Sequence, residues 1–303
     1  YRDDRQEGAS DPISQMNGFN LGNIRPISGG FSVKEGYVEA VIPLLKDLPW
    51  TQSLEVQTAA RFADYSTVGS VWTWKVGASW AITSDIRLRA GRSRDIRAPN
   101  IDELFASPFT QTNNVSDPAF APPNNNYLAQ YLTAGNPNLK EEVADTLTVG
   151  AVLSPRFLPG FSLSADYWDI SMEGAVATLD RNIVIARCWD GNADYCSFVQ
   201  RDPATGRVQR VTLTQLNLAE LRTRGIDFEA AYRIPLANIA ESLPGRLSLA
   251  FLGSYLIEKT IDDTLTRIDR AGEIGRNNTN NGPRFRATGP IGYDGNGFSL
   301  MVQ

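Results

Sequence analysis

The chain contains no histidine and only two cysteines among its 303 residues. Without histidine, the Ser-His-Asp and Cys-His forms of nucleophilic catalysis cannot be assembled. Zinc sites built on histidine and axial histidine ligation of haem are excluded for the same reason. The missing residue type therefore removes several common catalytic and metal-binding functions before any motif is considered.

Long apolar runs are missing as well. No stretch approaches the roughly 18 consecutive apolar residues that a membrane-spanning helix requires, and no charged-then-apolar targeting signal opens the chain at Tyr1. This excludes only a helical membrane protein. The formal net charge is −5, and the arginines are interspersed with acidic residues, which argues against a nucleic-acid partner.

What the chain does contain is regular alternation of apolar and polar residues, which predicts β-strands with one wet face. The alternation is clearest in residues 53–65 and 71–81, which a short polar link joins as a hairpin, and it recurs around residues 86–93, 146–153, 161–167, 227–233 and 246–251. We expect one shared apolar face formed by Leu54, Val56, Trp72, Trp74, Leu147, Val149, Leu163 and Leu249. We expect Glu55, Lys75, Thr148 and Ser248 on the opposite face.

The links between the predicted strands fall into two length classes. Ile82 to Asp85 and Ser154 to Gly160 are short, whereas Ile96 to Glu141, Ser171 to Leu221 and Ile257 to Pro283 are long and polar. An up-and-down antiparallel meander with short turns at one rim and long loops at the other produces this pattern. Long loops carried by a rigid scaffold usually serve binding.

Alternating strands fit either a soluble sandwich or barrel, or an outer-membrane barrel. In the membrane barrel the apolar face meets lipid, the other face lines a polar lumen, and strands of about 9 to 11 residues cross the bilayer. Reversing residues 53–65 would place Arg61 in lipid at a cost of up to about 2 to 4 kcal/mol, so the facing is strongly specified. Aromatic residues near the ends of the apolar faces suit interfacial girdles: Phe62, Trp72, Trp80, Tyr167, Tyr232 and Tyr255.

Four stretches, in this order, resemble consecutive barrel segments of the TonB-dependent outer-membrane receptors. They are "VKEGYVEAVIPLLKDLPWTQSLEVQTAARFADYSTVGSVWTWKVGASW", "SRDIRAPNIDELF", "GNPNLKEEVADTLTVGAVLSPRFLPGFSLSADYWDI" and "NLAELRTRGIDFEAAYRIPL". The likeness covers nearly the whole chain. The second stretch, from Ser93 to Phe105, is similar to the strand-to-loop signature of the family.

The resemblance implies an all-β fold, an antiparallel up-and-down transmembrane β-barrel segment with short periplasmic turns and long extracellular loops. Receptors of the family are 22-stranded barrels with an N-terminal plug, whereas this sequence contains about ten predicted strands. We therefore expect residues 1–303 to be a partial barrel domain, with the plug domain and the C-terminal strands absent. Such a piece leaves two unpaired strand edges, so we expect the isolated chain to misfold or aggregate unless it forms part of a larger barrel.

The function implied by the resemblance is capture of a scarce solute and its TonB-energised import across a bacterial outer membrane, without enzymatic conversion. A ferric siderophore is the leading solute and an oligosaccharide the next. Expected partners are outer-membrane lipid, the solute, and TonB, reached through the N-terminal region of the parent protein; no cofactor, metal or nucleic acid is expected. The alternatives are a passive porin or adhesin barrel, and a soluble all-β carbohydrate-binding protein or glycosidase.

Arginines recur along residues 87–97, and their placement bears on the candidate site. Arg87 and Arg89 are expected to face the lumen, whereas Arg94 to Glu103 are expected to form a turn at the extracellular rim. Pro99, which lacks an N–H, is expected to end the strand. Two interpretations of this charge cluster are open. Arg94, Asp95, Arg97, Asp102 and Glu103 either neutralise one another structurally or provide contacts for an anionic or polyhydroxylated solute.

Cys188 and Cys196 close a loop of nine residues. In an oxidising compartment a disulfide there would stabilise the fold by roughly 2.6 kcal/mol, and the rival interpretation, a zinc pair, has no further Cys or His to complete it. The resembling family stretch also commonly carries a cysteine pair in this loop. Apolar residues at Leu179, Ile183 and Ala186 indicate a short helix before it.

The long loops carry most of the free aromatic residues, so we expect the solute to bind at their rim. Stacking surfaces combined with fixed charges suit a catecholate siderophore or a sugar. The candidate contacts are Arg97, Asp102, Phe105, Phe109, Tyr127, Tyr131, Trp189 and Tyr195. The alternative for each aromatic residue is that it only packs the loops together.

Overall fold

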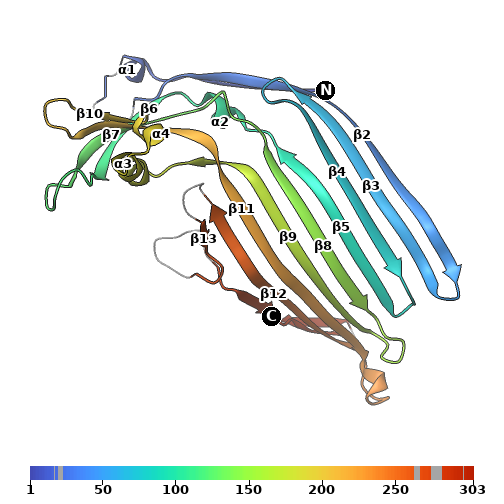
Figure 1. Ribbon diagram of the computed structural model, residues 1–303. Coiled ribbons are helices and arrows are strands. Elements are labelled where there is room, and N and C mark those ends of the chain that lie inside the picture. Colours follow the sequence, from blue (N-terminus) through green and yellow to red (C-terminus); the bar gives the residue numbers. More distant parts are fainter. Residues whose placement is uncertain (17, 20–22, 263–266, 274–281, 296) are drawn as a thin grey trace.

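A computed structural model describes residues 1–303 except 17, 20–22, 263–266, 274–281 and 296. Long antiparallel strands dominate it and form one curved, open sheet (Figure 1). The strands along the sheet, in their spatial order, are β1 (Arg2–Gly8), β2 (Ile27–Leu48), β3 (Thr51–Tyr65), β4 (Gly69–Ala81), β5 (Ile86–Arg97), β8 (Glu142–Leu153), β9 (Phe161–Thr178), β11 (Val208–Pro235), β12 (Arg246–Asp262), β15 (Ile291–Gly295) and β16 (Phe298–Val302). The expected antiparallel fold of about ten strands is confirmed, with eleven along this path in the described residues.

Shorter elements lie in the connections. The strands are β6 (Phe109–Ser116), β7 (Asn126–Ala134), β10 (Val199–Arg201), β13 (Arg267–Asp269) and β14 (Phe285–Thr288). The helices are α1 (Pro12–Gln15), α2 (Ile101–Phe105), α3 (Arg181–Trp189), α4 (Ala193–Cys196) and the 3-10 turn η1 (Leu236–Asn238). Among the described residues, no helix is both long and apolar enough to cross a membrane.

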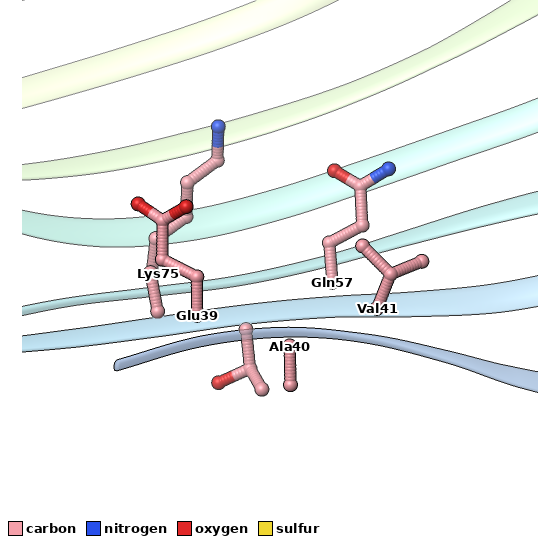
Figure 2. Close-up of a pocket in the computed structure, with 7 residues that line it drawn as sticks. Glu39, Ala40, Val41, Gln57 and Lys75 are labelled. Carbon is pink, nitrogen blue, oxygen red and sulfur yellow. The ribbon is translucent and has the colours of Figure 1, made fainter. Parts of the chain in front are cut away.

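The register confirms the predicted division into two faces. Direct cross-strand partners point to the same side of a sheet. Leu54 lies opposite Trp80, Val149 opposite Tyr167, and Leu249 opposite Tyr232, so the apolar set is continuous from β3 to β12. The polar set is continuous too, and in Figure 2 Glu39, Gln57 and Lys75 project from one side of the ribbons while Ala40 lies on the other. Hollows follow this polar side, which we call the inner face.

The connections alternate between two ends of the sheet. The turn rim carries residues 49–50, 82–85, 154–160 and 236–245, and the loop rim carries residues 66–68, 98–141 and 179–207. Both predicted short turns are therefore confirmed. The turn at 154–160 ends on Gly160, whose φ of +87° and close approach to the Arg233 carbonyl, 2.2 Å from an added Cβ, exclude any side chain.

The predicted long loops exceed the loops of the structure, because regular strands occupy part of their residues. Strand β9 continues to Thr178 and β11 begins at Val208, so about half of the expected loop from Ser171 to Leu221 is strand. The polar residues there still pair, since β9 up to Thr178 pairs with β11, and the start of β11 before Gln215 pairs with β7 and β10. Residues 263–266 and 274–281 of the third predicted loop lie outside the described residues.

The arginine segment also differs from the prediction. Residues 94–97 belong to β5 and do not form a turn. Arg94 pairs with Trp74 and Asp145, which puts its side chain on the apolar face. Arg87 and Arg89 face inward as expected, since they pair with Ala81 and Ser79. The alternation of this strand thus places its arginines on both faces.

The loop rim has a hydrophobic core of its own, formed by Val115, Ala129, Val184, Ile185, Tyr195, Val208, Val211 and Leu213. Strands β6 and β7 form a hairpin, and β7 runs parallel to the protruding start of β11, on which β10 also pairs. We call this unit, residues 109–134 and 179–214, the loop subdomain. It joins two connections that are distant in the sequence, as Figure 1 shows.

The sheet is open at both edges. Strand β1 covers β2 only up to Val33, so within the described residues the remainder of β2, to Leu48, has an unpaired edge. At the other side, β16 pairs only with β15 in that same part of the chain. The two expected unpaired edges are thus present, and in lipid their backbone groups need further strands.

Candidate functional site

The eight candidate residues lie in two groups. Arg97, Asp102 and Phe105 are at the loop-rim end of β5 and on α2, beside β1 and β2. Phe109, Tyr127, Tyr131, Trp189 and Tyr195 belong to the loop subdomain. The structure therefore does not gather the predicted contacts into a single cluster.

Helix α2 is short, and hydrogen bonds at its N-terminus stabilise its first turn. Asn100 caps it by accepting from the Glu103 N–H at 2.8 Å, and Glu103 in turn accepts from the Asn100 N–H at 2.8 Å. Pro99, which has no N–H to donate, precedes the cap and is fully buried. Asp102 lies in the first turn of this capped helix and is exposed.

Arg97 is held on two sides by carboxylates. Its guanidinium pairs with Glu103 at 2.9 Å and with Glu142 of the neighbouring strand at 2.5 Å. Glu142 is 7% exposed and also accepts from the Val176 N–H at 2.7 Å. Of the predicted mutual cluster, only the pair between Arg97 and Glu103 forms; Arg94 turns instead to Asp145, at 2.7 Å.

A groove of about 520 Å³ opens beside Arg97 at the loop rim, and we call it the rim groove. Its lining includes Arg2, Gln6, Phe31, Tyr65, Arg97 and Asp102. The Gln6 amide donates to the Asp102 carboxylate at 3.1 Å. Charges of both signs and two aromatic rings thus meet in one depression.

The aromatic wall of the rim groove is ordered by neighbouring side chains. The rings of Phe31 and Tyr65 lie 6.3 Å apart, and the Arg2 guanidinium lies 5.4 Å from the centre of the Phe31 ring. These residues were absent from the sequence-based candidates. Tyr65 could have been found, because alternation places it on the inner face at the loop-rim end of β3. Arg2 and Phe31 come together only through the pairing of β1 with β2.

Phe105 has a packing role in this conformation. An added Cβ at Gly29 would lie 2.3 Å from its ring, so the ring rests directly on the β2 backbone. Phe105 does not line the rim groove. Its contact instead anchors α2 to the sheet.

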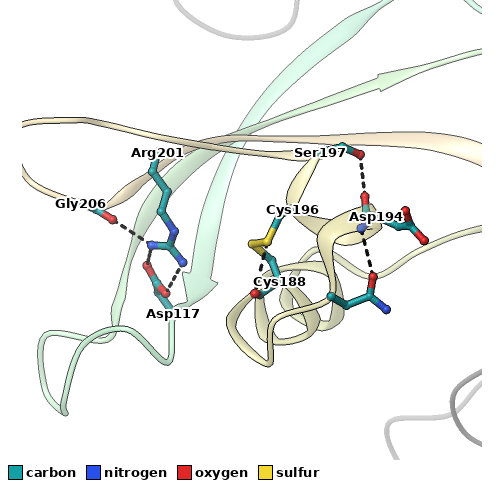
Figure 3. Close-up of a disulfide and its surroundings, with 8 residues drawn as sticks. Asp117, Cys188, Asp194, Cys196, Ser197, Arg201 and Gly206 are labelled. Atoms are coloured by element: carbon teal, nitrogen blue, oxygen red, sulfur yellow. Dashed lines mark hydrogen bonds and ion pairs between the residues drawn. A yellow bond between two sulfur atoms is a disulfide. The ribbon is translucent and has the colours of Figure 1, made fainter.

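The loop subdomain contains a buried polar network centred on Asp117, whose side chain is 0% exposed. Arg201 donates to both carboxylate oxygens at 2.7 and 3.0 Å (Figure 3). The Tyr127 hydroxyl also donates to this carboxylate, at 2.5 Å. Burial favours the neutral acid, but the hydrogen bonds from Arg201 and Tyr127 outweigh it and hold the pKa of Asp117 below its usual range. Burial and the bond to Asp117 raise the pKa of the Tyr127 hydroxyl.

The other subdomain aromatics mainly support packing. Tyr195 is 8% exposed within the core, and Tyr131 packs against that core while its hydroxyl donates to Gln111. Phe109 is half-buried at the start of β6, opposite Thr133. Trp189, by contrast, is 56% exposed at the end of α3.

Cys188 and Cys196 form the disulfide, with an S–S distance of 2.08 Å, and it ties α3 to α4 (Figure 3). Asp180 caps α3 through the Asn182 N–H at 2.8 Å, and Val184 and Ile185 point into the core. The predicted short helix is therefore confirmed. Trp189 follows Cys188 directly, so the disulfide holds it at the surface.

In the part of the chain that the structure describes, no group of three or more acidic or cysteine side chains could hold a metal ion. The charged groups near the candidate residues are already paired with partners of opposite charge. The arrangement suits recognition by stacking and hydrogen bonding.

The model of the family described as TonB dependent receptor-like, beta-barrel, matches residues 1–302. The chain therefore belongs to this family. Comparison with curated protein sequences finds no match.

Several solved structures share the fold. The siderophore receptor PirA from Acinetobacter baumannii aligns with a TM-score of 0.55 at 15% identity, covering 89% of this chain and 32% of that one. A variant of the ferric enterobactin receptor PfeA from Pseudomonas aeruginosa aligns with a TM-score of 0.58 at 15% identity, covering 90% and 32%. Another PfeA variant, in complex with enterobactin, gives 0.55 at 15% identity, covering 88% and 31%. This chain thus spans about a third of the length of these receptors.

Proposed function

We propose that the chain forms part of the barrel of a bacterial outer-membrane receptor that captures a scarce solute and imports it with energy supplied through TonB. The observation that carries this proposal is the family match over residues 1–302, together with a sheet that has one continuous apolar face and one polar face. The receptor moves its solute without converting it chemically.

The solute class that we favour is a ferric siderophore. The aligned structures include receptors named for siderophores and for ferric enterobactin, which supports but does not assign this class. An oligosaccharide is the second candidate, because rings beside fixed charges also suit a sugar. Membership of the family disfavours a soluble carbohydrate-binding protein, and dependence on TonB separates import from a passive porin or an adhesin.

We place the contacts with the solute on the loop rim, and the accessibility of the eight residues ranks them. Asp102 and Arg97 line the rim groove, and Trp189 is exposed on the loop subdomain. Phe109, Tyr127 and Tyr131 are half-buried and would offer ring edges, whereas Phe105 and Tyr195 would act by supporting their neighbours. Tyr65 and Phe31 join the proposed contacts because they line the same groove as Asp102.

Binding to cells that express the full-length receptor tests this placement. The probes are a ferric catecholate siderophore and a maltooligosaccharide, each titrated after surface expression has been matched. We expect Tyr65→Ala, Asp102→Asn and Trp189→Ala each to weaken binding of the catecholate about five- to thirtyfold, as loss of a stacking or charged contact does. Phe157→Ala, an 88% exposed ring on the turn rim, is the control that should bind like wild type.

Two different results would contradict the placement of the contacts and the solute class separately. If all three loop-rim variants bind like wild type, the contacts lie elsewhere in the receptor. If only the oligosaccharide binds, and the same variants weaken it, the site stands and the solute class changes.

A further inference from the structure

Two rows of charged residues cross the lipid-facing side of the sheet, next to its apolar band. A row here is a set of direct cross-strand partners on β5, β8, β9, β11 and β12. The row nearer the turn rim is Arg92, Leu147, Asp169, Arg224 and Glu258, and the row nearer the loop rim is Arg94, Asp145, Ser171, Arg222 and Thr260. We call Arg92, Arg94, Arg222 and Arg224 the arginine belt.

The adjoining row on the turn-rim side marks where the hydrocarbon begins. It consists of Ala90, Val149, Tyr167, Ile226 and Tyr255. Two tyrosines in one row are typical of an interfacial girdle, and the Tyr167 hydroxyl donates to Asp169 of the charged row at 3.2 Å. Arginine on the lipid face is costly at the midplane of a bilayer and nearly free of cost at the interface. The belt therefore lies at the level of the lipid headgroups on the loop-rim side.

Within the belt, each paired arginine side chain is more exposed than its acidic partner. The side chain of Arg94 is 48% exposed and that of its partner Asp145 is 26% exposed; for Arg222 and Asp169 the values are 41% and 16%. Arg224 pairs with Glu258 at 2.7 Å and is likewise the more exposed partner. A headgroup approaching this face consequently meets guanidinium groups before it meets carboxylates.

The guanidinium groups have donors to spare. Each arginine carries five N–H donors, and a bidentate contact with one carboxylate uses two of them. Arg94 and Arg222 make such contacts, with distances of 2.7 to 3.0 Å. Arg92 stands between Val76 and Leu147, and among the described residues no carboxylate lies within ion-pair distance of it, although its charge acts on Asp145.

Other charges face the belt from neighbouring elements. Glu173 of β9 acts on Arg94, and Arg267 of β13 pairs with Glu258 at 2.9 Å. In the two rows themselves, four arginines face three acids. Glu173, Glu220 and Asp262 continue the same face on the loop-rim side of the belt, so the excess of positive charge is confined to the two rows themselves.

We propose that the arginine belt binds phosphate groups of lipid headgroups in the leaflet next to the loop rim. Arginine matches phosphate with paired hydrogen bonds, whereas a headgroup without phosphate supplies neither the charge nor that geometry. The inference rests on the position of the barrel in the membrane and is independent of the imported solute.

The test uses the purified full-length receptor in a neutral detergent, with native mass spectrometry to count retained lipid. The probes are lipid A with two phosphates and the same lipid after enzymatic dephosphorylation. We expect preferential retention of the phosphorylated form, reduced about fivefold by Arg92→Gln and again by Arg224→Gln, which is the usual effect of one basic residue at a charged membrane surface.

Arg87→Gln is the matched control, because it removes the same charge from the same strand on the inner face. It should leave lipid retention unchanged. Equal retention of the two lipids by the wild-type receptor overturns the proposal, as does a loss with Arg87→Gln as large as that with Arg92→Gln. The comparison of lipids on the wild-type receptor remains decisive even where a variant folds poorly.

Discussion

The guanidinium of Arg97 and the carboxylate of Glu142 face each other across β5 and β8 at the loop rim, 2.5 Å apart. Glu103 of α2 pairs with the same guanidinium, and the Val176 N–H of β9 donates to Glu142. Three strands and the first helix of a long loop are thus fastened at one point. The rim groove opens directly beside it.

Removing the cation from this cluster should destabilise the loop rim. In Arg97→Gln, Glu142 loses its charged partner while remaining 7% exposed. We expect the free energy of unfolding of the full-length receptor to fall by about 2 kcal/mol, less than for a fully buried pair because Arg97 is half exposed. Denaturant titration followed by the heat-modifiable mobility of the barrel measures this.

The double variant Arg97→Gln with Glu142→Gln is its control. It removes the orphaned charge, so part of the lost stability should return, and a double-mutant cycle gives the coupling between the two residues. Strictly additive effects would show that the two groups do not interact.

Gly160 should not tolerate a side chain. Its positive φ and the nearby Arg233 carbonyl leave no room for a Cβ, whereas an added Cβ at Gly36 on β2 meets nothing within 4 Å. We expect Gly160→Ala to lower the free energy of unfolding by more than about 1 kcal/mol and Gly36→Ala to change it by less than about 1 kcal/mol. Equal effects of the two substitutions in refolding experiments would refute this reading of the turn.

Acid should loosen the loop subdomain through Asp117. Because the folded pKa of this carboxyl is lowered, its contribution to stability is fully present above its ordinary value near about 4 and is lost as the pH falls through the folded pKa. Protease cleavage within residues 109–134 and 179–214 should therefore accelerate below about pH 4 in the wild-type receptor. Asp117→Asn should be cleaved faster at neutral pH and should show a smaller acceleration; an identical pH profile would contradict the assignment.

The disulfide should stabilise the loop subdomain and leave the barrel unaffected. Cys188 and Cys196 lie in loop-rim helices, and the predicted entropy effect for so short a loop is about 2 to 3 kcal/mol. After reduction, or in Cys188→Ser with Cys196→Ser, cleavage within residues 179–207 should increase while the heat-modifiable mobility stays the same. A lower barrel melting temperature would show that the effect spreads into the sheet.

The faces of the sheet could be predicted because a period of two residues ties every side chain to one side. A shift by one residue would have moved Leu54 and Val56 to the inner face and Arg61 to the apolar face, and the pairing of β3 with β4 shows no such shift. The same rule applied to β5 places Arg92 and Arg94 outward, but the residues from Arg94 to Glu103 were predicted to form a turn. Charged residues on the apolar face near the loop rim weaken the alternation signal in that part of the strand.

The loop rim was harder to predict because its contacts are not local. The parallel pairing of β7 with β11 joins residues about 80 positions apart, and the ion pair between Arg201 and Asp117 spans a similar separation. The aromatic residues could be named from composition, but nothing in the sequence separated exposed Trp189 from buried Tyr195. Burial of Tyr195 follows from α3 and α4 packing together on the β-strands of the subdomain.

Energised import is the central claim, and the most direct test is uptake of a radiolabelled ferric catecholate siderophore by cells that express the full-length receptor, measured with and without TonB. We expect accumulation that exceeds the level of cells lacking the receptor, saturates with solute, and falls to the binding background when TonB is deleted or the proton gradient is collapsed. Accumulation that is unchanged without TonB would rule out energised import and indicate a passive pore.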